Sequence, residues 1–296
     1  MVPRMEFGIV LPQVQGATWD NALSTAKYAE EAGFDSLWVI DHVYGFPPQA
    51  GILEAWTMLA GLAPVTSRVG LGAQVFCQSF RSPALMAKMA TTLQLMTAGR
   101  LHFLIGAGWF QDEYEAFGWE FPPPGVRVGQ LRDTVKILKG MWNSGSEPFT
   151  YEGRHYSVSS VLNIPAPEPP IRLGIGGSGD RVLDLVAAEA DEWNCSASNL
   201  PVYEERKRVL EDRLAHYGRD VRRTLQLVFS PGDRQAPAAL QMFNPHLGLT
   251  GSIDQMVARV SELEALGVSG VFGMPAGRRA IDAMAEALPA LRKGAG

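Results

Sequence analysis

Several features that would assign a protein to a class at once are scarce in this sequence of 296 residues. Its two cysteines, Cys77 and Cys195, cannot build a disulfide framework. No apolar run is long enough to span a bilayer, since the densest one, residues 55–65, is too short. Basic residues number 26 against 31 acidic ones and form no run, which argues against a nucleic-acid or membrane partner. We therefore expect a cytoplasmic protein with reduced thiols that acts on a small-molecule substrate.

Apolar stretches rich in β-branched and aromatic residues alternate with helical patterns along the chain. Runs such as FGIVL, SLWVI and LQLVF are almost continuously apolar, as is typical of parallel strands buried on both faces. We predict eight strands, close to Glu6–Leu11, Asp35–Ile40, Val69–Val75, Leu101–Gly106, Ile171–Ile175, Glu192–Cys195, Thr224–Phe229 and Val268–Met274. Eight strand–helix units in a chain of this length favour an α/β fold, a (β/α)8 TIM barrel, as a single domain over residues 1–296. The alternative is a doubly wound open sheet, but the turn after the first strand lacks the GxGxxG spacing that binds phosphate in such folds.

Two connections are longer than a barrel needs. Residues 107–170 separate the fourth and fifth strands and hold one helix and FTYEGRHYSV, which predicts a hairpin turning at Glu152–Gly153. We therefore expect an insertion after strand 4. The second long connection, residues 230–251, follows the seventh strand. Long loops of compact barrels commonly form lids or walls of a site.

In a barrel the catalytic residues lie at the carboxyl ends of the strands. Residue types that are missing from these strand ends therefore exclude classes of enzyme. All six lysines fall on or beside predicted helices, which disfavours a Schiff-base aldolase. Of the five histidines only His42 lies at a strand end, so the cluster of a metal-dependent hydrolase is missing and we expect no metal. No GxSxG nucleophile elbow occurs either.

Glycine is abundant at these strand ends. The run GIGGSGD, residues 174–180, ends the fifth strand just before a predicted helix. Free backbone N–H groups at a helix N-terminus suit a phosphate, although a tight turn that needs glycine for its conformation is an equally simple interpretation. The run GAGW, residues 106–109, ends the fourth strand, where Trp109 either walls an aromatic ligand or closes the barrel.

Other strand-end residues have both a chemical and a structural interpretation. His42 could donate a proton or bind a redox ring, because imidazole titrates near neutrality, or it could cap the strand by pairing with a backbone carbonyl. Asp41 could orient His42 or pair with an arginine. We interpret both cysteines as small buried hydrophobic residues, and Glu113 as an acidic residue that a first helical turn favours without any chemistry.

Four blocks spread over nearly the whole chain carry a family resemblance. They are EEAGFDSLWVIDH (30–42), RSPALMAKMATTLQLMTAGRL (81–101), GAGWFQDEYEAFGWEF (106–121) and PPIRLGIGGSGDRVLDLVAAEADEWN (169–194). Together and in this order they resemble the luciferase-like monooxygenase family, and within it the deazaflavin F420-dependent oxidoreductases. The resemblance implies a barrel with an insertion after the fourth strand, and hydride transfer between coenzyme F420 and an unknown organic substrate.

The resemblance also implies roles for individual residues. In similar proteins the cofactor ring lies against a bulge of the third strand with a cis non-proline peptide, which matches Gln74 and Val75 here. By the same resemblance, backbone N–H groups of residues 176–178 hold the cofactor phosphate and His42, the candidate catalytic residue, lies near the reactive edge of the ring. The candidate cofactor-binding residues are Asp41, Ala73, Gln74, Val75, Gly108, Trp109, Gly176, Gly177, Ser178 and Gly179.

Two other functions remain open. One is an FMN-dependent monooxygenase that is served by a separate reductase, and the other is a non-catalytic barrel that carries a flavin. The resemblance further implies that a homodimer is possible. The loops at 107–127 and 230–251 should line the pocket, and their apolar residues favour a hydrophobic or aromatic substrate. These residues are Phe117, Trp119, Phe121, Met242 and Phe243.

Overall fold

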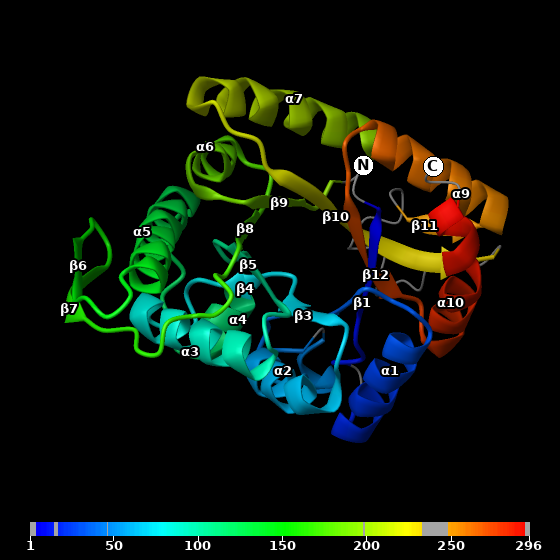
Figure 1. The fold of residues 1–296 in the computed structure, drawn as a ribbon, viewed down its shortest axis with the longest axis horizontal. Coiled ribbons are helices and arrows are strands. Elements are labelled where there is room, and N and C mark those ends of the chain that lie inside the picture. Colours follow the sequence, from blue (N-terminus) through cyan, green and yellow to red (C-terminus); the bar gives the residue numbers. More distant parts are fainter. Residues whose placement is uncertain (1–3, 15–16, 46, 198, 233–247, 294–296) are drawn as a thin grey trace.

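A computed structural model describes most of the chain (Figure 1). The described residues are 4–14, 17–45, 47–197, 199–232 and 248–293. Most of the predicted loop 230–251, with Met242 and Phe243, lies outside the described residues.

In the described residues, eight parallel strands close into a barrel. They are β1 (Glu6–Val10), β2 (Ser36–Val39), β3 (Gly70–Ala73), β5 (Leu101–Gly106), β8 (Leu173–Gly176), β9 (Glu192–Cys195), β10 (Arg222–Pro231) and β12 (Gly270–Pro275). Each strand pairs in parallel with the next, and the pairing of β9 with β10 completes the ring. The prediction of a TIM barrel is confirmed, and the open sheet is excluded. Two short strands, β4 (Phe76–Cys77) and β11 (Leu249–Gly251), add to β5 and β10 at the carboxyl ends.

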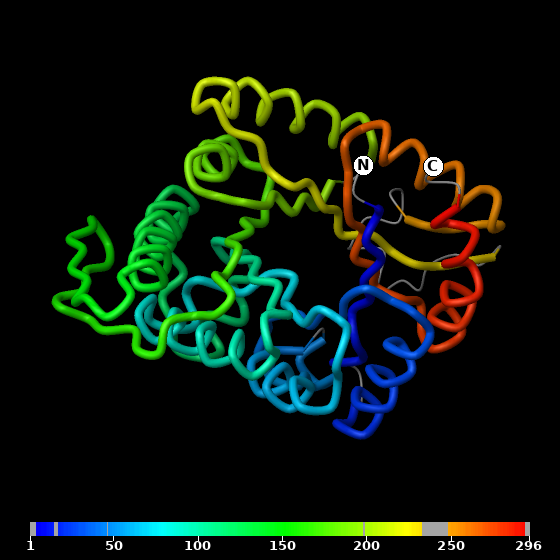
Figure 2. Tube along the Cα trace, viewed as in Figure 1, coloured from blue at the N-terminus to red at the C-terminus, as the bar shows by residue number. Residues whose placement is uncertain are grey.

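Helices surround the strands, as Figures 1 and 2 show. They are α1 (Trp19–Glu31), α2 (Ala55–Leu62), α3 (Pro83–Met96), α4 (Gln111–Ala116), α5 (Pro124–Asn143), α6 (Asp180–Glu189), α7 (Leu200–Tyr217), α9 (Ile253–Ala265) and α10 (Arg278–Lys293), with 3-10 turns at Pro48–Ala50 and Ala63–Val65. Side chains cap several of them, and Ser252 and Gln255 form a reciprocal capping box at the start of α9. None of the described helices is long and apolar enough to cross a membrane.

The core has two layers that the strands separate. Outward-facing strand residues pack against the helices, while Val10, Trp38, Ile40, Leu104, Phe272 and Met274 form a separate cluster. Trp38 stacks on Phe272 with ring centroids 4.0 Å apart, and a Cβ at Gly72 would lie 2.7 Å from the Trp38 ring. Glycine on the neighbouring strand thus makes room for a large aromatic side chain. The barrel centre is filled, so a ligand can enter only above this layer.

The insertion after the fourth barrel strand also follows the prediction. The antiparallel strands β6 (Phe149–Glu152) and β7 (Ser157–Val161) form the expected hairpin, which projects beside α5 (Figure 1). Asp133 of α5 is buried and anchors it, because its carboxylate accepts hydrogen bonds from the Tyr151 hydroxyl at 3.0 Å and the His155 N–H at 2.6 Å.

The third strand is shorter than predicted. The sequence predicts a strand to Val75, but β3 ends at Ala73 and the chain continues through a cis peptide between Gln74 and Val75. The backbone then resumes as β4, which pairs with β5 rather than with β2. This confirms the cis bulge that the resemblance implies, and the bulge turns Gln74 and Val75 toward the centre of the barrel mouth.

Candidate functional site

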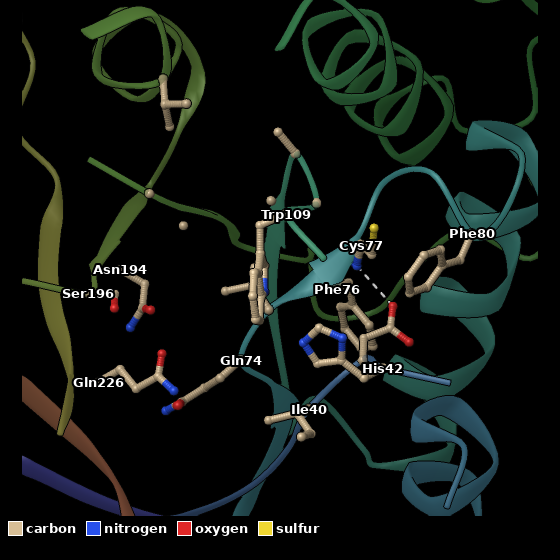
Figure 3. A pocket seen from close by; sticks show the side chains of 18 of the residues that line it. Ile40, His42, Gln74, Phe76, Cys77, Phe80, Trp109, Asn194, Ser196 and Gln226 are labelled. Atoms are coloured by element: carbon tan, nitrogen blue, oxygen red, sulfur yellow. Dashed lines mark hydrogen bonds between the residues drawn. The ribbon is translucent and has the colours of Figure 1, made fainter. Parts of the chain in front are cut away.

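The main cavity lies where the barrel strands end at their carboxyl termini, as Figure 3 shows at close range. It has a volume of about 480 Å³ and is walled by the segments that follow β2, β3, β5, β8 and β9. Ten of the eleven predicted site residues line it. The exception is Ala73, which is fully buried in the outer core, between the barrel and its helices.

His42 at the end of β2 is held by a carboxylate from a distant part of the chain. Its Nδ1 lies 2.9 Å from Oε2 of Glu113 in α4, and the Glu113 side chain is almost fully buried. The other oxygen of Glu113 accepts hydrogen bonds from the backbone N–H groups of Val43, at 2.5 Å, and Tyr44, at 3.1 Å. A carboxylate accepts hydrogen bonds only, so Nδ1 donates, and in the neutral imidazole Nε2 is then the acceptor atom.

Glu113 is a site residue that sequence reasoning missed. Its position in a first helical turn suggested only a favourable helix dipole, and α4 does begin at Gln111. Its contact with His42 spans 71 residues along the chain, so no local pattern announces it. The one available signal was that Glu113 falls inside the block 106–121 that carries the family resemblance.

Asp41 pairs with an arginine, which was one of its two expected roles. Both its oxygens accept from Arg81, at 2.8 and 3.0 Å, and Oδ2 also accepts the N–H of Cys77 at 2.9 Å. Arg81 reaches Glu54 as well, at 2.6 Å. Burial lowers the pKa of Arg81, but the two carboxylates outweigh burial and raise that pKa above its ordinary value. This network ties the end of β2 to the segment after β3 and so fixes the cavity wall.

The bulge after β3 places Val75 between two glycines. A Cβ at Gly106 would lie 2.7 Å from a Val75 methyl group, and a Cβ at Gly176 would lie 2.8 Å from the other. Side chains at either glycine would therefore displace Val75. The glycines of β5 and β8 thus let the bulge project into the cavity, where a planar ring could rest against it.

The loop after β5 needs glycine for a second reason. Gly108 has a φ of +78°, and a Cβ there would lie 1.9 Å from the hydroxyl oxygen of Tyr114. That hydroxyl lies 3.2 Å from the sulfur of Cys77. Burial raises the pKa of the Cys77 thiol to about 12, so the thiol stays protonated at neutral pH. Cys77 and Cys195 are both buried and free, as expected for residues that do not act as nucleophiles.

Aromatic side chains form the rim of the mouth around His42. Trp109 and Phe110 lie with ring centroids 5.6 and 6.2 Å from the imidazole, both edge-on. Trp119 stacks on Phe80 at 4.7 Å and on Phe117 at 5.2 Å. Trp109 is half exposed, so it presents an aromatic surface to an entering ligand. Phe80 and Trp109 line the cavity, whereas Phe117, Trp119 and Phe121, which the sequence predicts as lining residues, do not.

The segment between β8 and α6 offers backbone amides. Gly177, with a φ of +127°, donates its N–H to the Asn194 carbonyl at 3.1 Å, so this amide is engaged within the fold. Ser178 and Gly179 line the cavity, and Gly179 starts α6 without a side-chain cap. A Cβ at Gly179 would meet no atom within 4 Å, so the space beside it is open. Backbone N–H groups at such a helix start attract anions.

The floor of the cavity is made of side-chain amides. Gln74, Asn194, Ser196 and Gln226 line it, and in Figure 3 the three amides point toward one another. Asn194 donates to Thr224 at 3.0 Å, whereas Gln226 has, among the described residues, a single 3.9 Å contact with the Met274 sulfur. Both amide atoms of Gln74 are buried without a hydrogen-bond partner among the described residues. Gln226 was not predicted, although it interrupts the apolar run LQLVF.

The described residues hold no group of three His, Cys, Asp or Glu placed to bind a metal ion.

Two relatives illustrate the activities of proteins to which the chain is similar. An F420-dependent glucose-6-phosphate dehydrogenase from Amycolatopsis mediterranei is 28% identical over 254 residues, covering 81% of this chain and 74% of that protein. The pyrimidine monooxygenase RutA from Pseudomonas syringae is 30% identical over 192 residues, covering 63% of this chain and 48% of that protein. The chain therefore spans about half the length of the second relative.

A comparison with a solved structure and a match to a family profile agree with the observed barrel fold. The structure of an F420-dependent secondary alcohol dehydrogenase in complex with an F420–acetone adduct superimposes with a TM-score of 0.84 at 20% identity, covering 98% of this chain and 99% of that one. At this identity the likeness shows the fold alone. The profile of the luciferase-like monooxygenase family matches residues 5–266, which is most of the sequence. The chain therefore belongs to the luciferase-like monooxygenase family and is an oxidoreductase of that family.

Proposed function

We propose that this protein transfers a hydride between coenzyme F420 and an uncharged, apolar organic substrate. The observation that carries the proposal is the pairing of His42 with Glu113 beside a bulge that can support a planar ring. A relative that covers most of the chain is named as F420-dependent, which supports this cofactor over FMN.

The residues of the mouth fit a ring with an anionic tail. Val75 and the cis bulge supply a surface for the ring, and the unpartnered amide of Gln74 supplies hydrogen-bonding groups below it. Ser178, Gly179 and the first turn of α6 supply amides for a phosphate. When bound, the deazaflavin supplies a site that accepts or donates a hydride.

His42 manages the proton that accompanies the hydride. When an alcohol is oxidised to a carbonyl compound, its C–H bond gives up a hydride and its O–H bond gives up a proton. Because Glu113 accepts the hydrogen bond from Nδ1, the proton is taken or returned at Nε2. The buried Glu113 carboxylate also stabilises the imidazolium that forms, while the aromatic rim excludes water.

The substrate class follows from the charge of the cavity. None of the described residues that line it is a lysine or an arginine, and Phe80, Trp109 and Tyr114 are among its lining residues. A sugar phosphate would need a cationic partner for its dianion. We therefore propose an apolar alcohol or carbonyl compound as substrate, and not glucose 6-phosphate, which the name of one relative gives as its substrate.

Fluorescence titration with F420 and with FMN tests the cofactor. We expect F420 to bind with micromolar or better affinity and FMN more weakly. Retention of FMN with no binding of F420 would refute the proposal.

A substrate panel with F420 then compares apolar secondary alcohols with sugar phosphates, and turnover of only the sugar phosphates would refute the substrate class.

A second candidate is an FMN-dependent monooxygenase, which the similarity to a pyrimidine monooxygenase favours. It predicts a yellow purified protein and oxygen uptake that depends on a separate reductase.

A non-catalytic flavin carrier is the third possibility, and it predicts that His42→Ala leaves every measured activity unchanged.

A further inference from the structure

One side chain at the cavity floor is left without partners by the fold. Gln74 is only 7% exposed, yet neither its amide nitrogen nor its amide oxygen has a hydrogen-bond partner among the described residues. It lines the cavity and points into it (Figure 3). Buried amides are nearly always hydrogen-bonded, because an unmade bond forfeits the interaction with water. Gln74 therefore has hydrogen-bonding capacity that the described residues leave unused, and it lines a cavity that a ligand can enter.

The chemistry of a carboxamide specifies its partner. Gln74 offers an N–H donor and a C=O acceptor side by side in one plane. Their complement is another planar group in which a carbonyl and an N–H are neighbours, which is a lactam or imide edge. A carboxylate could accept from the N–H but would leave the C=O unpaired, whereas a hydroxyl would have to serve both atoms through one oxygen.

The neighbouring residues at the cavity floor support the interpretation that Gln74 is available to a ligand. Gln226 lines the same cavity, and among the described residues its side chain makes one such contact, the 3.9 Å approach to the Met274 sulfur. Asn194 by contrast is held by Thr224, whose hydroxyl also donates to Glu192 at 2.7 Å. The two glutamine amides therefore offer hydrogen-bonding capacity at the floor that the amide nitrogen of Asn194 has already used.

We propose that Gln74, assisted by Gln226, binds the lactam edge of the pyrimidinedione ring of the cofactor. This inference rests on the proposed function, because that edge belongs to the deazaflavin. The pair of hydrogen bonds fixes which end of the ring lies at the cavity floor. Gln74 thus serves as a cofactor-orienting residue that precedes the cis peptide and acts through its side chain.

The first test measures F420 affinity by fluorescence titration in Gln74→Met, which keeps the side-chain length and removes both polar atoms. Two neutral hydrogen bonds lost at a buried site weaken binding by roughly tenfold. The matched control is Gln78→Met. Gln78 is a glutamine four residues on that is also buried with an unpartnered amide oxygen, but it donates to Ser79 at 2.5 Å and does not line the cavity. We expect its affinity to match that of the wild type.

The second test begins with the wild type and changes the ligand instead of the protein. An F420 derivative methylated at N3 of the ring has lost the lactam N–H, and we expect the wild type to bind it about tenfold more weakly than F420. In Gln74→Met the two ligands should bind equally, since the discriminating side chain is gone. Equal binding of both ligands by the wild type, or unchanged F420 affinity in Gln74→Met, would overturn the proposal. Failure of the wild type to bind F420 at all would instead refute the proposed function.

Discussion

The two ends of the barrel use polar side chains in opposite ways. At the amino end of the strands, Glu6 accepts from the Ser36 hydroxyl at 2.5 Å and pairs with Arg222, while Asp35 pairs with Arg4 at 2.6 Å and Arg292 at 3.0 Å. A second cavity of about 340 Å³ lies there among these charges. At the carboxyl end, the amide of Gln74 is buried without partners.

This difference separates what stabilises the fold from what receives a ligand. Each carboxylate named at the amino end is already paired with an arginine, so these groups hold the barrel strands together. The carboxyl end has fewer charges but more unused hydrogen-bonding capacity. We therefore identify the carboxyl end as the functional end by the unused hydrogen-bonding groups in its cavity, and not by its charge. Substitutions should impair stability at one end and binding or turnover at the other.

The largest effect should come from His42 at the carboxyl end. His42→Ala removes the group that moves the substrate proton, so we expect turnover to fall by about 10²–10⁴-fold. Steady-state kinetics with F420 and an apolar alcohol measure it. His216→Ala, at the exposed end of α7, is the control and should keep full activity. Equal turnover in His42→Ala and the wild type would break the comparison, because the mouth would then not be catalytic.

The amino end should show the converse behaviour. Arg222→Met leaves Glu6 and Glu192 without their shared guanidinium, and we expect the unfolding free energy to drop by about 3 kcal/mol, at the lower end for buried pairs because Arg222 is partly exposed. F420 affinity should remain unchanged. Urea denaturation measures the loss, and Arg208→Met, which breaks an exposed pair with Glu204, should cost no more than about 0.5 kcal/mol.

The same pair gives the pH dependence of stability. Burial tends to raise the pKa of Glu6, but His102, Arg222 and the Ser36 hydroxyl outweigh it and hold that pKa below its ordinary value of 4.5. A lowered carboxyl pKa stabilises the fold above the ordinary value, and this contribution is lost as the pH falls through the folded pKa. The wild type should therefore lose stability more steeply than Arg222→Met below about pH 4.5. Parallel acid profiles for the two proteins would contradict this account.

Gly108 tests whether the mouth itself is structurally constrained. Gly108→Ala is destabilised both by its positive φ and by a Cβ that collides with the Tyr114 hydroxyl. Gly118→Ala is destabilised by its φ of +71° alone, because the space around residue 118 is open. We expect about 1–2 kcal/mol of destabilisation for Gly118→Ala and about 1–3 kcal/mol more for Gly108→Ala. Equal losses in urea denaturation would show that the loop adjusts to the added methyl group.

The smallest effect concerns the two buried thiols. Burial raises the pKa of Cys77 and of Cys195 from the ordinary 9.0 to about 12. Above pH 9.0 the unfolded chain ionises its thiols first, so stability should fall as the pH rises toward about 12. At pH 10 the expected loss per thiol is on the order of 1 kcal/mol. Urea denaturation at pH 8 and pH 10 checks this, and Cys195→Ala should lose less stability between them than the wild type.

Much of the barrel could be predicted from local patterns. The continuous apolar runs at the eight strands indicate buried parallel strands, and the glycine-rich run 176–179 indicates a loop with accessible backbone amides, without any knowledge of neighbours in space. Glu113 illustrates the limit of such reasoning. Its position in a first helical turn could be predicted from the sequence, but its hydrogen bond to His42 could not, because the two residues lie 71 positions apart. Ala73 illustrates the converse, because a residue next to the bulge can face the outer core rather than the cavity.

The sequence by itself determined the architecture, because hydrophobic periodicity acts within a few residues and is written along the chain. It also placed His42 and the glycine runs at strand ends. Only the tertiary structure decided which polar groups are paired and which are left open, as the contrast between Asp41 and Gln74 shows. A hydrogen bond requires a donor and an acceptor within about 3 Å, and that distance is set by strands and loops that meet only when the barrel closes.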